Sequence, residues 1–363
     1  MTLDITQSRL RSQRVSDPAA TVQEAVRSLG AVQGQDYGAS LWAVGLRTRK
    51  GTSRIVEAAI ADGSIVRTWP MRGTLHLVAA GDARWMLELL GPEMVATHAR
   101  RFRELGITEA LVARSQALMS AALCGGRRLV RGQLYEVLKE GGIPGGDMAY
   151  HLAWRAAHDR VLCIGPREGK QPTFVLFDDW IPASSALPRE EALARIANRY
   201  FTGHGPATIR DLGWWSGLKA ADARQATAAA EGIVSRHIDG RDYWFAEDAL
   251  DSTKGTRRTF VLPAFDEYLV GYRDRAAALR PELMKVVNAG GGLLAPVVVR
   301  GGQVVATWKR KTNGKVTSVV VKPFGSPSMS WKRDVETAFR RYLRFVPVDA
   351  EIEFQPAPVS PAV

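Results

Sequence analysis

The chain has 363 residues, of which 46% are hydrophobic, so it is long enough for two to four small domains and its composition is that of a folded protein. No apolar run is long enough to span a membrane, and the N-terminal segment lacks the apolar core of a signal peptide. The two cysteines, Cys124 and Cys163, are too few for a disulfide framework and do not have metal-ligand spacing. These features predict a cytoplasmic protein and exclude a disulfide scaffold and structural zinc.

The formal net charge is +12 and the isoelectric point is about 9.9. A surplus of Lys and Arg attracts phosphate backbones, because neutralising phosphates releases counterions. Basic proteins also owe their charge to solubility or to contact with anionic membranes. Charge alone therefore leaves nucleic-acid binding as one interpretation among several.

One pattern occurs three times along the chain: two helical stretches followed by two short strands joined by a turn. The first copy covers residues 29–44, 52–69 and 71–79. The second begins with residues 128–142, continues with a helix over 147–160 and ends in strands within 161–177.

The third copy has the clearest signals. Residues 206–218 predict a helix with a Thr208 cap, and residues 220–232 predict a second helix closed by a glycine. Residues 233–246 alternate around Asp239-Gly240, which is a strong signal for a hairpin. Trp214 and Trp215 have the spacing of core residues, so we expect both to pack inside.

Helix, turn, helix and hairpin is the plan of a winged helix, in which the second helix enters the major groove. From about Thr259 the chain becomes β-rich over 259–272, 293–310 and 316–324, with turns at Gly301-Gly302 and Asn313-Gly314, and a helix follows over 331–346. We therefore predict an α+β fold of three tandem winged-helix units and a small β-barrel-like domain with a terminal helix. The predicted boundaries are 1–115, 116–185, 186–252 and 253–363.

Conventional catalytic signatures are absent, including the G-x-S-x-G, H-E-x-x-H and phosphate-loop motifs. His76 lies in the apolar strand segment GTLHLVA. Its neighbours favour a structural histidine, and the functional alternative is a contact to a phosphate or base.

Gln33 and Gln35 lie in an otherwise apolar stretch. Their side chains face the same side if the backbone is extended or turning, and they diverge if it is helical. Gly34 and Gly38 indicate a helix end or a kink. A pair of amides can fix a water or a base edge but cannot act as a general base. The alternative is that both are ordinary polar residues at a helix terminus.

Basic residues suited to phosphate contacts fall into two sets, although each one alone is a typical solvated surface charge. The first set is expected at turns and helix starts and comprises Arg67, Arg72, Arg127, Arg128 and Arg131. The second lies in the β-rich region and comprises Lys309, Arg310, Lys311, Lys315, Lys332 and Arg333.

Three segments together resemble the AlkZ-like family of winged-helix DNA glycosylases: LGAVQGQDYGASLWAVGLR, RTWPMRGTLHLVAAGD and LPAFDEYLVGYRDR. The resemblance covers nearly the whole chain. It implies a monofunctional enzyme that hydrolyses the N-glycosidic bond of alkylated purines, including bases in interstrand crosslinks. Gln33 and Gln35 match the two catalytic glutamines of the family, whereas Gly34 stands where the family has an aliphatic residue.

The family chemistry needs few catalytic groups, because an alkylated purine is cationic and leaves without a protonating acid. What remains is to hold a water near an oxocarbenium-like sugar. Asp36 is the nearest carboxylate, and we expect it to cap a helix or lie at the surface; electrostatic assistance to the reaction is the alternative. The resemblance implies double-stranded DNA with alkylated bases as partner. The sequence indicates no metal or organic cofactor, and we expect a nucleoid-associated monomer because the repeated units already supply a long DNA-binding surface.

Two other hypotheses remain open at this point. One is a DNA-binding protein without catalysis, such as a transcriptional regulator or a nucleoid-associated factor, because winged helices are often regulators. The other is a protein that acts on RNA or serves as a scaffold, for which the basic charge is the only support.

Overall fold

The computed structural model describes residues 3–248, 257–288, 290, 293–313, 316–346 and 348–356. The chain divides into two compact units that each combine distant segments. Unit 1 comprises Met1–Val56, Asn198–Trp215 and Glu231–Val363, and unit 2 comprises Glu57–Ala197 and Ser216–Ala230. This division differs from the four predicted segments, whose boundaries stay a prediction; the one expected near Ser252–Thr256 lies outside the described residues.

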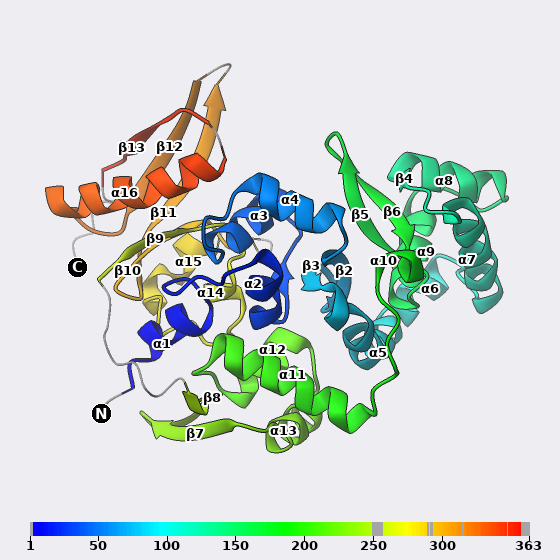
Figure 1. Ribbon diagram of the computed structural model, residues 1–363, viewed down its shortest axis with the longest axis horizontal. Helices are drawn as coiled ribbons and strands as arrows, with labels where there is room; N and C mark the ends of the chain where they lie inside the picture. The colour runs from blue at the N-terminus through cyan, green and yellow to red at the C-terminus, as the bar shows by residue number, and fades with distance from the viewer. Residues whose placement is uncertain are drawn as a thin grey trace. The chain divides into compact units, whose positions relative to one another are not determined.

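Unit 1 contains short helices, a two-stranded hairpin and a five-stranded sheet (Figure 1). Its helices, some of which reach into residues of unit 2, are α1 (Ile5–Ser12), α2 (Val22–Leu29), α3 (Tyr37–Leu46), α12 (Ile209–Ser216), α14 (Glu267–Val270), η2 (Pro281–Leu283), α15 (Met284–Val287) and α16 (Met329–Phe345). Its strands are β1 (Val32–Gln33), β7 (Ile233–Ile238), β8 (Arg241–Ala246), β9 (Thr259–Leu262), β10 (Val297–Arg300), β11 (Gln303–Asn313), β12 (Val316–Pro323) and β13 (Ala350–Phe354).

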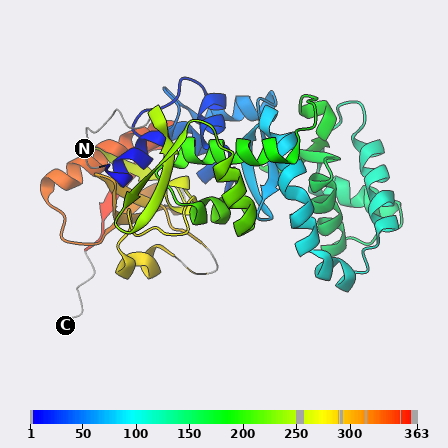
Figure 2. The same ribbon diagram turned by 90° about the horizontal axis from the view of Figure 1, so that it is seen from below.

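The large sheet of unit 1 has the order β13-β12-β11-β10-β9, so in the described part of the chain it has two edge strands where the sequence predicted a barrel-like closure. All neighbours are antiparallel except β12 and β13, which are parallel. A parallel neighbour needs a crossover connection, and α16 supplies it. Figure 2 shows α16 in orange beside these strands. The predicted terminal helix is therefore followed by one more strand.

Unit 2 is built from helices around a mainly antiparallel sheet whose strands run in the order β3-β2-β5-β6-β4. The strands are β2 (Ile65–Met71), β3 (Thr74–Ala79), β4 (Leu129–Val130), β5 (Leu162–Glu168) and β6 (Gln171–Leu176). The helices lying wholly or mostly in it are α4 (Ser53–Ala61), α5 (Ala80–Thr97), α6 (Ala99–Glu104), α7 (Glu109–Leu123), α8 (Arg131–Glu140), α9 (Asp147–His158), α10 (Phe177–Trp180), α11 (Arg189–His204) and α13 (Ala220–Ala228). None of the helices in the described residues is long and apolar enough to cross a membrane.

The order helix, helix, hairpin occurs three times, as α3-α4-β2-β3, α8-α9-β5-β6 and α12-α13-β7-β8. The β7–β8 turn has Asp239 and Gly240 at φ 48° and 76°, the left-handed values that an Asp-Gly hairpin turn requires. The predicted element sequence is thus confirmed. That each copy works as a winged helix stays a prediction.

The segment 259–272 differs from its prediction, because only its first four residues form a strand. Pro263 cannot donate to a sheet ladder, and the Asp266 carboxylate then accepts the backbone N–H of Tyr268 at 2.9 Å. This cap starts α14 at Glu267. The expected Asn313-Gly314 turn lies partly outside the described residues.

In unit 1, α3 and α16 pack closely against β9. The Trp42 ring lies 5.3 Å from that of Tyr342 and 5.1 Å from that of Phe345, and its indole N–H donates to the Val261 carbonyl at 2.9 Å. A Cβ on Gly45 would lie 2.1 Å from the Phe345 ring, so only glycine permits this approach.

The two tryptophans of α12 differ in their environment. Trp215 is fully buried, as predicted. Trp214 is 45% exposed, so the prediction that it packs in the core is wrong. Adjacent helical residues point in different directions, and only one of the two can face the interior. The indole N–H of Trp214 donates to the Val270 carbonyl at 3.2 Å.

A buried ion pair joins the end of α3 to the start of α14. Arg47 Nη1 and Nη2 donate to the two Asp266 oxygens at 2.8 and 2.7 Å, and both side chains are at most 1% exposed. Arg47 also donates to the carbonyls of Gln13 and Ala43 and to the Gln13 side chain. Such bidentate, fully hydrogen-bonded geometry is what makes a buried charge pair tolerable.

We predict that Arg47→Met lowers the free energy of unfolding by about 3–5 kcal/mol, because the Asp266 carboxylate stays buried without its counter-charge. Urea denaturation measures the change. Arg49→Met is the control, since Arg49 is 68% exposed and has a 3.9 Å pair with Asp17 and a hydrogen bond to the Pro18 carbonyl at the surface. Equal effects of the two substitutions would contradict the prediction.

Unit 2 contains a histidine held in its neutral form. The centroids of the His158 and Trp154 rings lie 3.8 Å apart with the planes tilted by 40°, and His158 Nδ1 lies 2.9 Å from the Trp154 carbonyl. Burial lowers the pKa of His158 to about 4, and the neighbouring His98 acts in the same direction.

Because the folded-state pKa lies below the unfolded value of about 6.5, unfolding takes up a proton between these values. We therefore predict that the stability of unit 2 is full above pH 6.5 and falls, by up to about 3 kcal/mol, as the pH drops toward 4. Hydrogen exchange of the α9 amides between pH 7 and 4 measures this loss. His158→Gln should remove the His158 part of the slope, and an unchanged slope would contradict the assignment.

Candidate active site

The site containing Gln33 and Gln35 lies within unit 1, where the chain leaves β1 and enters α3. The backbone here is extended and then bends, so the two side chains face each other and the helical alternative is excluded. Gln33 Nε2 donates to Gln35 Oε1 at 3.0 Å, and the backbone N–H of Gln35 donates to Gln33 Oε1 at 2.9 Å. The two bonds hold the Gln33 amide in one orientation.

The two glutamines differ in exposure. Gln33 is 7% exposed, whereas Gln35 lies at the surface. Asp36 caps α3 as expected, because its carboxylate accepts the N–H of Ala39 at 2.9 Å. In the glutamine pair, the Gln33 side chain is therefore buried in the protein, whereas the Gln35 side chain is exposed to solvent.

A buried carboxylate lies behind Gln33. Glu267 is fully buried, and its Oε1 accepts the backbone N–H of Gln33 at 3.0 Å. Its Oε2 accepts the indole N–H of Trp215 at 3.2 Å and lies 3.3 Å from Nε2 of His204. The carboxylate thus joins β1, α11, α12 and α14 at one point.

The peptide chain around Glu267 is fixed as firmly as its side chain. Gln13 Nε2 donates to the Glu267 carbonyl at 3.1 Å and to the Tyr272 hydroxyl at 3.0 Å. The Tyr272 hydroxyl in turn donates to the His204 carbonyl at 2.6 Å. Burial raises the pKa of the Tyr272 hydroxyl, so it stays a neutral donor.

Sequence reasoning did not single out Glu267. The only signal was its place in the DEYLVGY segment, which was predicted to be β-rich. Glutamate is rarely buried unless it is paired, and the sequence does not show which distant donors surround it.

Arg310 is brought toward the site through α16. Burial raises the pKa of the Tyr342 hydroxyl, and the negative charge of Asp36 raises it slightly further. The Arg310 guanidinium, which is hydrogen-bonded to the Tyr342 side chain, lowers this pKa. Tyr342 also packs against Trp42 of α3, with ring centroids 5.3 Å apart. Lys309 and Lys311 are exposed on the opposite face of β11, since alternate residues of a strand share a face.

Four of the five arginines in the first basic set lie where they were expected. Arg72 is in the β2–β3 turn at φ 54°, Arg127 and Arg128 precede β4, and Arg131 is the first residue of α8. Arg127 donates to the Ala121 and Cys124 carbonyls. The Arg128 guanidinium lies 5.2 Å from the Trp180 ring centroid.

Arg67 does not lie at a turn or a helix start. It is in the middle of β2, opposite Leu77 of β3 and Ile164 of β5, and is 8% exposed. A residue paired on both sides in the middle of a sheet has little access to solvent. The prediction that Arg67 lies at a turn or helix start is therefore wrong, because strand β2 extends from Ile65 to Met71 on both sides of it.

His76 is fully buried, as the structural interpretation requires. Its Nδ1 lies 2.9 Å from the Thr74 carbonyl and its Nε2 lies 3.3 Å from an Arg72 guanidinium nitrogen. A neutral ring protonated on Nδ1 satisfies both contacts. The ring therefore contacts Arg72 from the interior, and whether either residue contacts DNA stays a prediction.

The remaining basic residues of the second set are Lys332, Arg333 and Lys315. The Lys332 ammonium lies 5.5 Å from the Phe354 ring centroid, and Arg333 is exposed. Lys315 lies outside the described residues. The described part of the chain holds no group of three or more metal-ligating residues, and Cys124 and Cys163 are free thiols.

Comparison with known proteins identifies the family and a structure with the same fold. The model of the family "DNA glycosylase AlkZ-like" matches residues 26–345. The chain is 28% identical over 324 residues to the "Interstrand DNA cross-link repair glycosylase" of Streptomyces sahachiroi, covering 81% of this chain and 83% of that protein. The fold is similar to the solved structure of the Streptomyces sahachiroi DNA glycosylase AlkZ, with a TM-score of 0.80 and 24% sequence identity. The match covers 98% of this chain and 100% of that chain.

The protein is thus an enzyme of the DNA glycosylase class, with a mixed α/β fold and DNA as its substrate. It belongs to the DNA glycosylase AlkZ-like family. Membership supports the first of the three hypotheses and neither the regulator nor the RNA-acting protein.

Proposed function

We propose that the protein hydrolyses the N-glycosidic bond of N7- or N3-alkylated purines in double-stranded DNA, with Gln33 and Gln35 holding the attacking water. The observation that carries this proposal is the pair of hydrogen bonds that locks a buried Gln33 amide against an exposed Gln35 amide.

The chemistry fits two amides without a general base. An alkylated purine is cationic, so the C1′–N bond breaks with its electron pair going to the base. Water then forms the C1′–O bond at an oxocarbenium-like sugar and releases its proton to solvent. An amide oxygen can accept a hydrogen bond from that water and orient its lone pair toward C1′.

The hydrogen bonds to Gln35 leave the Gln33 amide able to bind the attacking water. Its two bonds to Gln35 use one of two amide donors and one of the two oxygen lone pairs. A water bound at the remaining positions would meet an amide that cannot rotate. Such fixed dipoles need no rearrangement as charge develops in the transition state.

Glu267 is proposed as a positioning residue. Its carboxylate holds the Gln33 backbone through one hydrogen bond and is itself held by Trp215. A carboxylate behind the site would also favour the positive charge that develops on the sugar.

The substrate class is proposed to include bases in interstrand crosslinks. The name of the Streptomyces sahachiroi relative describes repair of such crosslinks. A crosslinked base is tethered to the opposite strand and cannot swing into a deep pocket, as most glycosylases require. A site with the exposed Gln35 at its surface suits a base that stays near the duplex.

The three helix–helix–hairpin segments are proposed to act as winged helices that bind the duplex as a monomer. The exposed basic residues expected to contact phosphates are Arg127, Arg128, Arg131, Lys309, Arg310 and Lys311, together with Arg72, which is only partly exposed. Phosphate contacts of this kind set the position of the protein on DNA rather than its choice of base.

We predict that Gln33→Ala and Gln35→Ala each lower the rate of base release from duplex DNA carrying N7-methylguanine by about 100-fold or more, the usual effect of losing one preorganised hydrogen-bonding group. Single-turnover release measures the rate. The Kd for undamaged duplex should stay within about twofold, since neither residue carries charge. Full activity in both variants, or no release by wild type on methylated or crosslinked duplex, would refute the proposal.

Glu267→Gln keeps the acceptor for Gln33 but turns an NH₂ group toward the donors of Trp215 and His204. We predict a single-turnover rate lowered by about tenfold with unchanged Kd for DNA, because Gln33 shifts while the surface stays intact. Glu282→Gln, an exposed change of the same type, should have no effect. A loss that appears only in Kd would show that Glu267 does not position the amides.

A further inference from the structure

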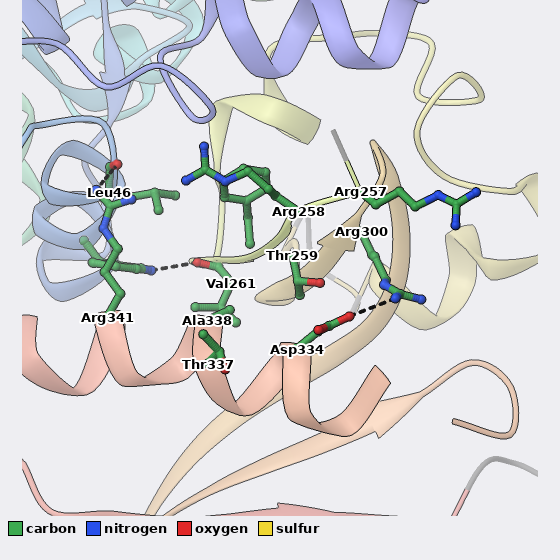
Figure 3. Close-up of a pocket in the computed structure, with 12 residues that line it drawn as sticks. Leu46, Arg257, Arg258, Thr259, Val261, Arg300, Asp334, Thr337, Ala338 and Arg341 are labelled. Atoms are coloured by element: carbon green, nitrogen blue, oxygen red, sulfur yellow. Dashed lines mark hydrogen bonds and ion pairs between the residues drawn. The ribbon is translucent and has the colours of Figure 1, made fainter. Parts of the chain in front are cut away.

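A hollow of about 580 Å³ lies within unit 1, bordered by β9, β10, α16 and the end of α3 (Figure 3). Among the described residues, its charged lining consists of four arginines and one carboxylate: Arg257, Arg258, Arg300, Arg341 and Asp334. We call this feature the arginine groove. Figure 3 shows Arg300 directed at Asp334 and Arg341 directed at the Leu46 carbonyl.

Two hydrogen-bond donors in the arginine groove are buried without a partner in the described part of the chain. They are the Thr259 hydroxyl and Arg300 Nε. The two residues are directly opposite on the antiparallel strands β9 and β10, so their side chains share one face of the sheet. Orphaned buried donors on adjacent strands are costly unless a ligand accepts from them.

Among the described residues that line the arginine groove, positive charge exceeds negative charge. Burial lowers the pKa of Arg341, and the charges of Arg258 and Arg344 lower it further. Arg300 Nη2 pairs with Asp334 at 2.8 Å. One carboxylate against four guanidinium groups leaves mutual repulsion, which a bound anion would relieve.

The arginine groove shares two helices with the active site. Leu46 of α3 lines the groove, while Asp36, next to Gln35, caps the other end of the same helix, about 15 Å away. Arg341 of α16 lies in the groove, and the adjacent Tyr342 senses the Asp36 charge. A ligand in the groove would therefore lie about half a turn of duplex from the glutamines.

We propose that the arginine groove binds a backbone phosphate of the DNA duplex whose damaged base lies at Gln33 and Gln35. This inference rests on the proposed function. Guanidinium groups pair bidentately with phosphate oxygens, and the Thr259 hydroxyl adds a neutral donor. The groove then holds the duplex in register, and the glutamines act on the base.

The test measures the Kd of the full chain for undamaged duplex DNA at several salt concentrations. Thr259→Val removes the hydroxyl without changing shape or charge, so it should weaken binding by about fivefold, the value of one hydrogen bond. Arg257→Ala should weaken it by about tenfold and reduce the slope of log K against log salt by about 1. Asp334→Asn should tighten binding.

Lys285→Ala is the matched control for Arg257→Ala, because it removes one exposed charge of unit 1 outside the groove. Equal effects of these two variants, or an unchanged Kd for both Thr259→Val and Asp334→Asn, would overturn the proposal. A third outcome would also overturn it: the variants lose the binding of inorganic phosphate, measured by calorimetry, but bind DNA as tightly as the wild type.

Base release by wild type and Gln35→Ala is measured on the same preparations. Since the salt titration uses undamaged DNA, failure of the groove and failure of the glycosylase mechanism give separate results. A groove that passes the test while base release is absent would refute only the mechanism.

Discussion

The Arg47–Asp266 pair is the constraint on which the rest of unit 1 depends. It joins residues 219 positions apart in a fully buried, bidentate contact. Two charges can stay in a dry interior only if all their hydrogen bonds are made, so the geometry around them tolerates little variation. Asp266 also caps α14, and the residue that follows the cap is Glu267. The ion pair therefore fixes the position of the Glu267 carboxylate.

The candidate active site is therefore held by a buried carboxylate beneath it. Glu267 holds Gln33, and Gln33 holds Gln35. Each step moves outward, from a fully buried carboxylate to an exposed amide. This arrangement suits a reaction in which the leaving group is already charged, because the protein must supply position more than acid or base strength.

The net charge of the chain overstates what is available to DNA. The Arg9 guanidinium lies 3.7 Å from the Tyr272 ring centroid and donates to the Pro206 carbonyl, and Arg47 forms a buried ion pair with Asp266. These arginines stabilise the fold because their planar groups can bridge several carbonyls and a ring at once. The charge that remains is exposed on turns, on β11 and in the arginine groove.

The sequence by itself determined the order of the three helix–helix–hairpin segments, the Asp239-Gly240 turn and the Asp36 cap, because each depends on neighbours within a few residues. It left open whether the side chains of Gln33 and Gln35 face each other. It did not determine the burial of Arg67 and Glu267, the exposure of Trp214 or the parallel strand β13. These depend on which distant segments meet, and periodicity carries no information about partners hundreds of residues away. Only the tertiary structure could place Glu267 behind Gln33 and bring Thr259 and Arg300 onto one face of a sheet.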